Sequence, residues 1–148
     1  MEVDAFVADS VSAVEGKLYA LGAGWNGINT TQLPARHARL GIGVIIRVPY
    51  TATNEVHRLE LRIDDSDGRS IPIADAPPGA DAVDGKLYTI DGHFNVGRPP
   101  QLTPGDDQIV VIAMNIDGLV FEKADAYNVV IEIDGDEVKR LAIRVTLA

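Results

Sequence analysis

The sequence predicts an all-β fold, an immunoglobulin-like sandwich of eight to nine mostly antiparallel strands. Short segments of alternating or β-branched apolar residues recur between turn residues at a spacing typical of sandwiches. No segment carries an apolar helical stripe longer than two turns. The chain has 148 residues, 46% of them hydrophobic, so a single domain over residues 1–148 can bury a core without cross-links.

Composition narrows the classes of function. The chain has no cysteine, which excludes disulfides, zinc–thiolate sites and a cysteine nucleophile. A formal net charge of -9 disfavours nucleic acid and anionic membranes and favours basic proteins or cations as partners. The N-terminus shows no signal peptide and no apolar run is long enough to span a membrane, so we expect a cytoplasmic or virion protein.

The first elements are predicted as a strand over Val3–Ala13, a turn at Glu15-Gly16 and a strand over Leu18–Ala23. In the second strand Tyr19 and Leu21 share a face with Trp25. We interpret Trp25 as a core residue at the strand end; the alternative is a platform on which a ligand stacks.

A polar loop with a proline is predicted over residues 26–36, before a strand over His37–Val48. One face of that strand is wholly apolar, and the other carries Gly41 and Gly43, which indicates close packing against a bulky group such as Trp25 or a tyrosine. A strictly alternating strand over His57–Asp64 comes next and ends in a hairpin turn at residues 65–68.

The middle of the chain is less regular. We predict a short edge strand over Arg69–Ala74, because Pro72 cannot donate to a ladder, and then a loop to Asp84. A strand over Lys86–Val96 is expected to bend or bulge at Asp91-Gly92. The proline-rich residues 97–105 favour a stiff crossover.

The last three strands are predicted over Gln108–Ile116, Tyr127–Ile133 and Glu137–Leu147. The first is apolar on both faces, which indicates the centre of a sheet or a strand at an interface. Asp134-Gly135 is the strongest hairpin signal of the chain. In the last strand the apolar face switches between Val138 and Leu141, which predicts a bulge near Lys139-Arg140.

Three motifs together resemble a family. They are Asp9 with Gly-Lys-Leu-Tyr-Ala-Leu-Gly-Ala-Gly-Trp at residues 16–25, Gly-Arg-Pro-Pro at 97–100 with Pro-Gly-Asp at 104–106, and the hairpin over residues 127–135. The chain resembles a domain-of-unknown-function family of small bacterial and phage-associated proteins. The resemblance implies an immunoglobulin-like or related β-sandwich and carries no catalytic residues.

Candidate sites are few. The three histidines, His37, His57 and His93, lie far apart in sequence, and we interpret them as surface or edge residues rather than zinc ligands. Turn aspartates suit Asx turns, while loops at one end of a sandwich offer an alternative calcium site. The residues of that alternative metal site are Asp65, Asp67, Asp134 and Asp136.

No nucleophile elbow, paired catalytic acids or phosphate-binding glycine loop is present, so we expect no enzyme and no cofactor. The leading hypothesis is a non-enzymatic protein-interaction or structural accessory module that binds a protein partner or self-assembles, with a virion surface as one setting. The alternative is a small-ligand or calcium-binding sandwich. The expected ligand or partner contacts are Trp25, Tyr19, Tyr88 and Arg98. For Arg98 the competing interpretation is an arginine that bonds loop carbonyls.

Overall fold

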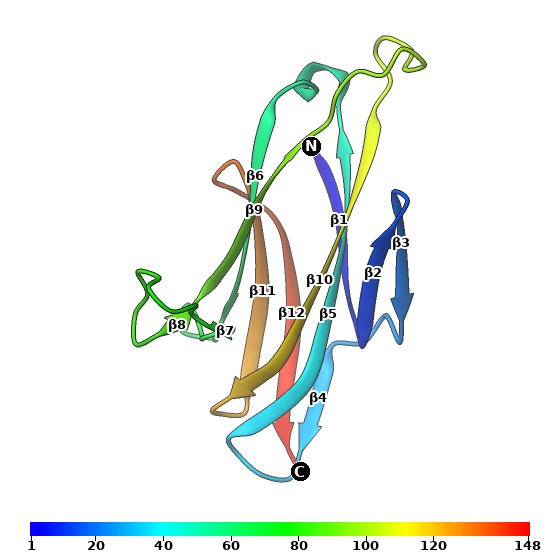
Figure 1. Cartoon of the computed structure of the whole chain (residues 1–148). Helices are drawn as coiled ribbons and strands as arrows, with labels where there is room; N and C mark the ends of the chain where they lie inside the picture. Colours follow the sequence, from blue (N-terminus) through cyan, green and yellow to red (C-terminus); the bar gives the residue numbers. More distant parts are fainter.

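The fold of the computed structural model, which describes all 148 residues, is all-β, as the sequence predicts. Two antiparallel sheets, apart from one parallel edge strand, pack face to face (Figure 1). The first has the order β1 (Glu2–Ala8), β5 (Ala35–Val48), β10 (Gln108–Phe121). The second has the order β4 (Gly27–Thr30), β12 (Asp136–Leu147), β11 (Asp125–Ile133), β6 (Val56–Asp64), β9 (Thr89–Asn95).

Two small hairpins complete the fold: β2 (Ser10–Val14) with β3 (Lys17–Leu21), and β7 (Ala74–Asp75) with β8 (Lys86–Leu87). The only helical element is one 3-10 turn, Tyr50–Ala52. None of the chain forms a helix that is long and apolar enough to cross a bilayer.

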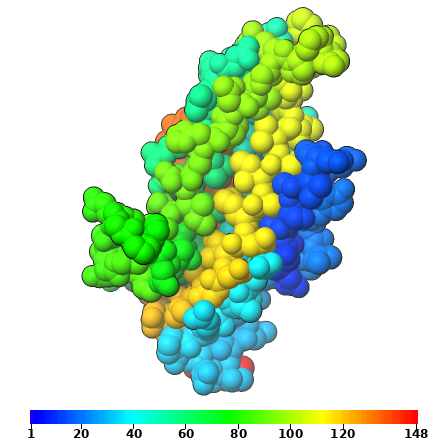
Figure 2. Space-filling model, in the orientation of Figure 1, coloured from blue at the N-terminus to red at the C-terminus, as the bar shows by residue number.

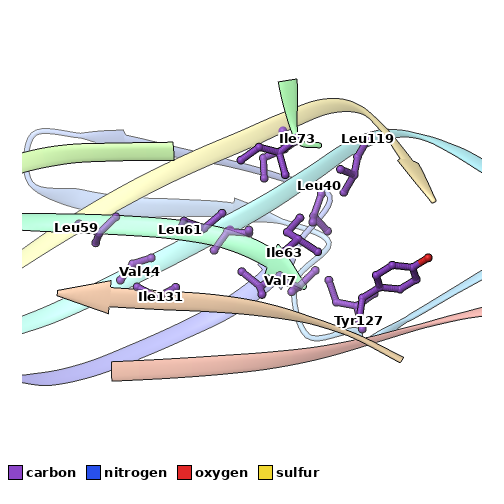
Figure 3. Packing of buried hydrophobic residues seen from close by; sticks show 14 of the residues in the cluster. Val7, Leu40, Val44, Leu59, Leu61, Ile63, Ile73, Leu119, Tyr127 and Ile131 are labelled. Carbon is purple, nitrogen blue, oxygen red and sulfur yellow. The ribbon is translucent and has the colours of Figure 1, made fainter. Parts of the chain in front are cut away.

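The core is one cluster between the two sheets, to which the predicted apolar faces contribute (Figure 3). Every second residue of β5 from Leu40 to Val48 is fully buried, which confirms the predicted face of that strand. Leu61 and Ile63 of β6 and Ile131 of β11 are equally buried opposite them. Alternation therefore identified the residues that hold the sheets together.

The predicted first strand breaks at Asp9 into β1 and β2. The backbone N–H of Asp9 donates to the carbonyls of Leu21 and Gly22, at 3.0 and 3.2 Å, so the chain leaves the first sheet and forms the β2–β3 hairpin. The predicted loop over residues 26–36 is also wrong in part, because β4 pairs in parallel with the end of β12. Parallel pairing with a distant strand leaves no local sequence signal.

Residues 69–96 differ most from the prediction. Arg69–Ala74 is not a continuous strand: Ser70 forms an isolated bridge with Asp64, and Ala74 alone belongs to a strand, β7, in which it pairs with Leu87. The strand over 86–96 breaks at Tyr88, and its register with β6 runs without irregularity through Asp91 and Gly92. The proline-rich crossover does connect β9 in one sheet to β10 in the other.

The bulge predicted near Lys139-Arg140 is present one residue earlier, at Val138. The β11–β12 register shifts where Ile131 pairs with Lys139 and Glu132 with Glu137, which leaves Val138 without a partner.

Strand β10 runs on to Phe121, beyond its predicted end at Ile116, with Gly118 at φ +69°. Beyond this glycine Leu119 and Phe121 are buried, so the core-facing side of β10 changes there.

Tyr127 anchors the start of β11. Its ring is buried against Phe121, and its hydroxyl donates to the backbone carbonyl of Lys123 at 2.8 Å. We predict that Tyr127→Phe lowers the free energy of unfolding by about 1 kcal/mol, because the carbonyl of Lys123 loses its donor while the packing stays. Urea denaturation measures the loss, and an unchanged midpoint would contradict it.

Candidate functional site

The β2–β3 hairpin stands on the outer side of the first sheet (Figure 1). Glu15 and Gly16, both at positive φ, form its predicted turn. The side chain of Asn115 on β10 holds the hairpin in place: its Oδ1 accepts from the N–H of Val11 at 3.0 Å, and its Nδ2 donates to the carbonyl of Val11 at 2.9 Å. Val11 is buried beneath the hairpin, so the opposite face is turned outward.

That outward face carries three exposed apolar side chains among two serines and a lysine. In the hairpin register Ser10 pairs with Leu21, Ser12 with Tyr19 and Val14 with Lys17, so these side chains share one face. Leu21 is 73% exposed, Tyr19 55% and Val14 52%. Residues of both strands of the hairpin line an open hollow of about 450 Å³. We call Val14, Tyr19 and Leu21 the hairpin face.

Trp25 lies apart from this face, which corrects the prediction that it shares a face with Tyr19 and Leu21. Gly22 and Gly24, at positive φ, redirect the chain, and the N–H of Gly24 donates to the carbonyl of Val7 at 3.0 Å. Trp25 instead packs half-buried against the core and contacts His37 edge-on at 5.7 Å between ring centroids. The indole Nε1 of Trp25 and the Nε2 of His37 are buried without a hydrogen-bond partner.

The other two expected contact residues lie elsewhere. Tyr88 is half-buried in the break between β8 and β9. Arg98 donates from Nε to the hydroxyl of Thr53 at 2.5 Å and from Nη2 to the carbonyl of Tyr50 at 3.1 Å, with its guanidinium 4.2 Å from the Tyr50 ring centroid. This geometry matches the interpretation of Arg98 as a residue that bonds loop groups. The four expected contact residues thus do not share one site.

The aspartates of the alternative metal site lie at opposite ends of the β6–β11 pair. Asp65 and Asp67 follow Asp64, which pairs with Asn128 at one end, whereas Asp134 and Asp136 follow Ile133, which pairs with Leu59 at the other end. Asp65 and Asp67 lie 3.5 and 3.6 Å from the ammonium of Lys123, which also lies 3.4 Å from Asp125. Nowhere in the chain do three histidine or acidic side chains gather as metal ligands would.

Asp125 belongs to the same network at the start of β11. Its Oδ2 accepts from the hydroxyl of Ser66 at 2.8 Å and from the N–H of Ser66 at 3.1 Å. These bonds, together with the nearby Lys123, hold the pKa of the Asp125 carboxyl well below its usual range. The network ties the turn after β6 to the start of β11.

His57 corrects the prediction of a surface or edge histidine. It is 4% exposed, stacks on Phe94, and has an acceptor at each ring nitrogen. Nδ1 lies 2.7 Å from Oδ2 of Asp134, and Nε2 lies 2.7 Å from the carbonyl of Ala52. Because both partners accept, both bonds form only when the imidazole carries two protons.

The pKa values of this pair follow from its geometry. Burial alone would lower the pKa of His57, but the Ala52 carbonyl and the Asp134 carboxylate together raise it above its ordinary value. Bonds from His57 and from the N–H of Arg58 lower the pKa of Asp134. Asp134, expected only as a turn residue or calcium ligand, thus ties the last hairpin to a buried histidine.

A cavity of about 430 Å³ lies at one end of the molecule, between the chain before β7 and the end of β10. Its apolar walls include Ile71, Ile73 and Leu119. Lysines at its rim are paired with carboxylates, Lys86 with Asp75 at 2.5 Å and Lys123 with the network described above. None of the expected contact residues lines this cavity.

Comparison with known proteins decides the family. The model of a family described as of unknown function, DUF6941, matches residues 3–146, nearly the whole chain. The chain belongs to the DUF6941 family. This confirms that the chain belongs to a family of unknown function; the role of the three motifs and the bacterial and phage association stay predictions. No curated protein matches the DUF6941 chain.

Proposed function

We propose that this DUF6941 chain is a non-enzymatic protein-interaction or structural accessory module that contributes to a larger assembly through the hairpin face. The observation that carries the proposal is that Leu21, Tyr19 and Val14 are all exposed on one face of a hairpin. Large apolar side chains exposed together on one face of a protein are a common mark of an interaction site. Burying each of them in an interface would contribute about 1.5–3 kcal/mol.

Rigidity supports the same proposal. Asn115 pins the hairpin through the backbone of Val11, and Asp9 closes its open end. A surface held in this way loses little conformational freedom when a partner binds. The alternative, a small-ligand or calcium-binding protein, has less support because its residues lie apart. Cytoplasmic or virion localisation stays a prediction, and so does the absence of nucleic acid and membrane partners.

The immunoglobulin-like assignment belongs to the proposal as well. The bond from the Tyr127 hydroxyl to the carbonyl of Lys123, four residues earlier, supports it, because immunoglobulin-like domains carry such a tyrosine corner. Two features differ from a purely antiparallel immunoglobulin-like sandwich: β4 pairs in parallel with β12, and two small hairpins are added.

Site-specific photo-crosslinking tests the proposed function. A benzoylphenylalanine placed at Tyr19, in the cells that make the protein, is expected to give a discrete protein adduct. The same group at Thr103, an exposed residue of the proline-rich crossover, is the matched control and should not give this adduct. Adding Leu21→Glu should abolish the adduct at position 19, since a carboxylate on the hairpin face opposes apolar burial.

The controls keep the outcome clear. Tyr19 and Leu21 are exposed, so both variants should unfold at the wild-type denaturant concentration. An absent adduct at position 19, or the same adducts at positions 19 and 103, would contradict an interaction through the hairpin face.

A further inference from the structure

Strand β10 is an edge strand, contrary to the sequence-based expectation that it lies at the centre of a sheet. Its only hydrogen-bonded neighbour is β5. It is nevertheless apolar on both faces over residues 109–114, a composition that suits a strand covered on both sides. Because β10 is not central, its composition favours the other interpretation, a strand at an interface. Figure 2 shows the band of β10 uncovered between β9 and the β2–β3 hairpin.

The hydrogen-bonding pattern of the first sheet identifies which residues of β10 point their backbone N–H and C=O groups to the free edge. The carbonyl of Val7 accepts from Gly24, so Val7 points its backbone groups away from β5. Along an antiparallel strand the backbone N–H and C=O groups of successive residues point to opposite edges. Phe6, next to Val7, therefore bonds to its partner Gly43 on β5. Ile42 and Val44, on either side of Gly43, then bond to their partners Met114 and Ile112 on β10. Ala113, opposite Gly43, then points its N–H and C=O away from β5, as do Val111 and Ile109 by the same alternation.

These groups have no backbone partner in the chain. Farther along, Asn115 uses its side chain to hold the β2–β3 hairpin, so the open part of the edge runs from Gln108 to Ala113. An unpaired edge of this length is a template for an added strand, and soluble proteins usually block such edges with charges, prolines or bulges. Residues 109–114 contain none of these.

Apolar side chains flank the open edge. Val110, Ile112 and Met114 face the core but are only partly buried, whereas their partners in β5 are fully buried. On the opposite sheet, Ile90 and Phe94 of β9 are partly buried as well, and β9 is also an edge strand. An added strand would cover these side chains with every second residue of its own.

The charge near the edge of β10 distinguishes two candidate occupants, a second copy of this chain and a basic segment of another protein. Asp106 and Asp107 are exposed directly before β10, and neither takes part in an ion pair. A second copy of the chain would bring its own net charge of -9 to this edge, which opposes self-pairing. A strand that carries lysine or arginine complements the acidic end.

We propose that the edge of β10 from Gln108 to Ala113 binds an extended segment of a partner protein by strand addition. The segment has apolar side chains at alternate positions and a basic residue that reaches Asp106 and Asp107. Main-chain hydrogen bonds to Ile109, Val111 and Ala113 hold the segment, and the alternating side chains select it. This site is separate from the hairpin face and does not depend on it.

Hydrogen exchange measured by NMR tests the proposal on the full chain. The probe is a synthetic peptide of about nine residues in which valine and threonine alternate between terminal lysines. At saturation we expect the amide exchange of Ile109, Val111 and Ala113 to slow at least about tenfold, because these N–H groups become donors in a new ladder. The amides of Val110 and Ile112, already bonded to β5, should change much less.

Matched variants and peptides sharpen the test. Val111→Pro removes an N–H that points to the open edge, which an edge strand tolerates, and should weaken binding at least about tenfold, while Val111→Ala should retain it. A peptide N-methylated at alternate residues should not bind, and this control holds even if the proline variant does not fold. A peptide with glutamate in place of lysine should bind more weakly.

Three results would overturn the proposal: no slowed exchange at Ile109, Val111 and Ala113 with the lysine peptide, equal binding of the N-methylated peptide, or protection of the edge by self-association without any peptide. Leu21→Glu should leave peptide binding unchanged, so a failure of the hairpin face and a failure of the β10 edge are separate outcomes.

Discussion

Asp134→Ala is expected to lower the free energy of unfolding by about 2–3 kcal/mol. The carboxylate accepts from the ring of His57 at 2.7 Å and from the N–H of Arg58 at 2.9 Å, and both bonds are lost. His57 is 4% exposed, so its ring keeps a proton that points at no acceptor, or gives that proton up. Asp134 also has φ +53°, a conformation that alanine adopts less readily than aspartate.

The loss should depend on pH. The raised pKa of His57 contributes stability that is fully present below its unfolded value of about 6.5 and is lost as the pH rises through the folded pKa. The lowered pKa of Asp134 contributes stability that is present above about 3.8 and is lost as the pH falls through the folded pKa. The pair therefore stabilises the fold most between these two values.

Urea denaturation at about pH 5.5 and about pH 8.5 measures this effect. Asp134→Asn keeps the turn and one acceptor oxygen but removes the charge, so its cost should be larger at the lower pH. Asp136→Ala is the matched control, because Asp136 is an exposed acid of the same hairpin without an ion pair or side-chain hydrogen bond, and its effect should stay within about 0.5 kcal/mol. A cost of Asp134→Asn that is equal at both pH values would show that His57 is neutral in the fold.

Gly43→Ala is expected to cost about 2 kcal/mol, although alanine usually suits a strand better than glycine. The side chain of Phe6 on β1 lies directly over Gly43 of β5, and a methyl group there would overlap the aromatic ring. Phe6 would have to swing off the sheet and expose its ring. The bulky group over Gly43 is therefore Phe6, rather than Trp25 or a tyrosine, whereas Gly41 lies close to the backbone of Ala8 and Ser10.

A double-mutant cycle checks this assignment. In a Phe6→Ala background the cost of Gly43→Ala should fall below about 0.5 kcal/mol, because the overlap is gone. Gly92→Ala in β9 is the control substitution, since no heavy atom lies near the position of its added carbon, and it should be neutral or slightly stabilising. Equal costs of Gly43→Ala in both backgrounds would sink the role of Phe6.

The sequence reveals the parts of this fold that depend on neighbouring residues. Alternation in β5 and β6 identified the buried face of each strand, because side chains of a strand point to opposite sides in turn. Turns at Glu15-Gly16 and Asp134-Gly135 were predictable because glycine suits the positive φ angle at the second position of each turn. The bulge at Val138 was predictable from the change of apolar face.

The candidate sites were less predictable. Tyr19 was a candidate contact and is exposed on the hairpin face, but its neighbours there are Val14 and Leu21 rather than Trp25. His57 and Asp134 lie 77 residues apart in the chain, so no spacing rule could join them. A buried histidine on an alternating strand was the available signal: His57 shares the apolar parity of Leu59 and Leu61.

By itself, then, the sequence determined the all-β class, the core faces and the tight turns, since each follows from the conformational preferences and burial of residues close together in the chain. Only the tertiary structure decided which strands become neighbours. Backbone hydrogen bonds between strands are the same for every sequence, so composition does not say whether a strand is central or at an edge. That is why β4 could pair with β12 without a local signal, and why β10, apolar on both faces, could lie at an open edge.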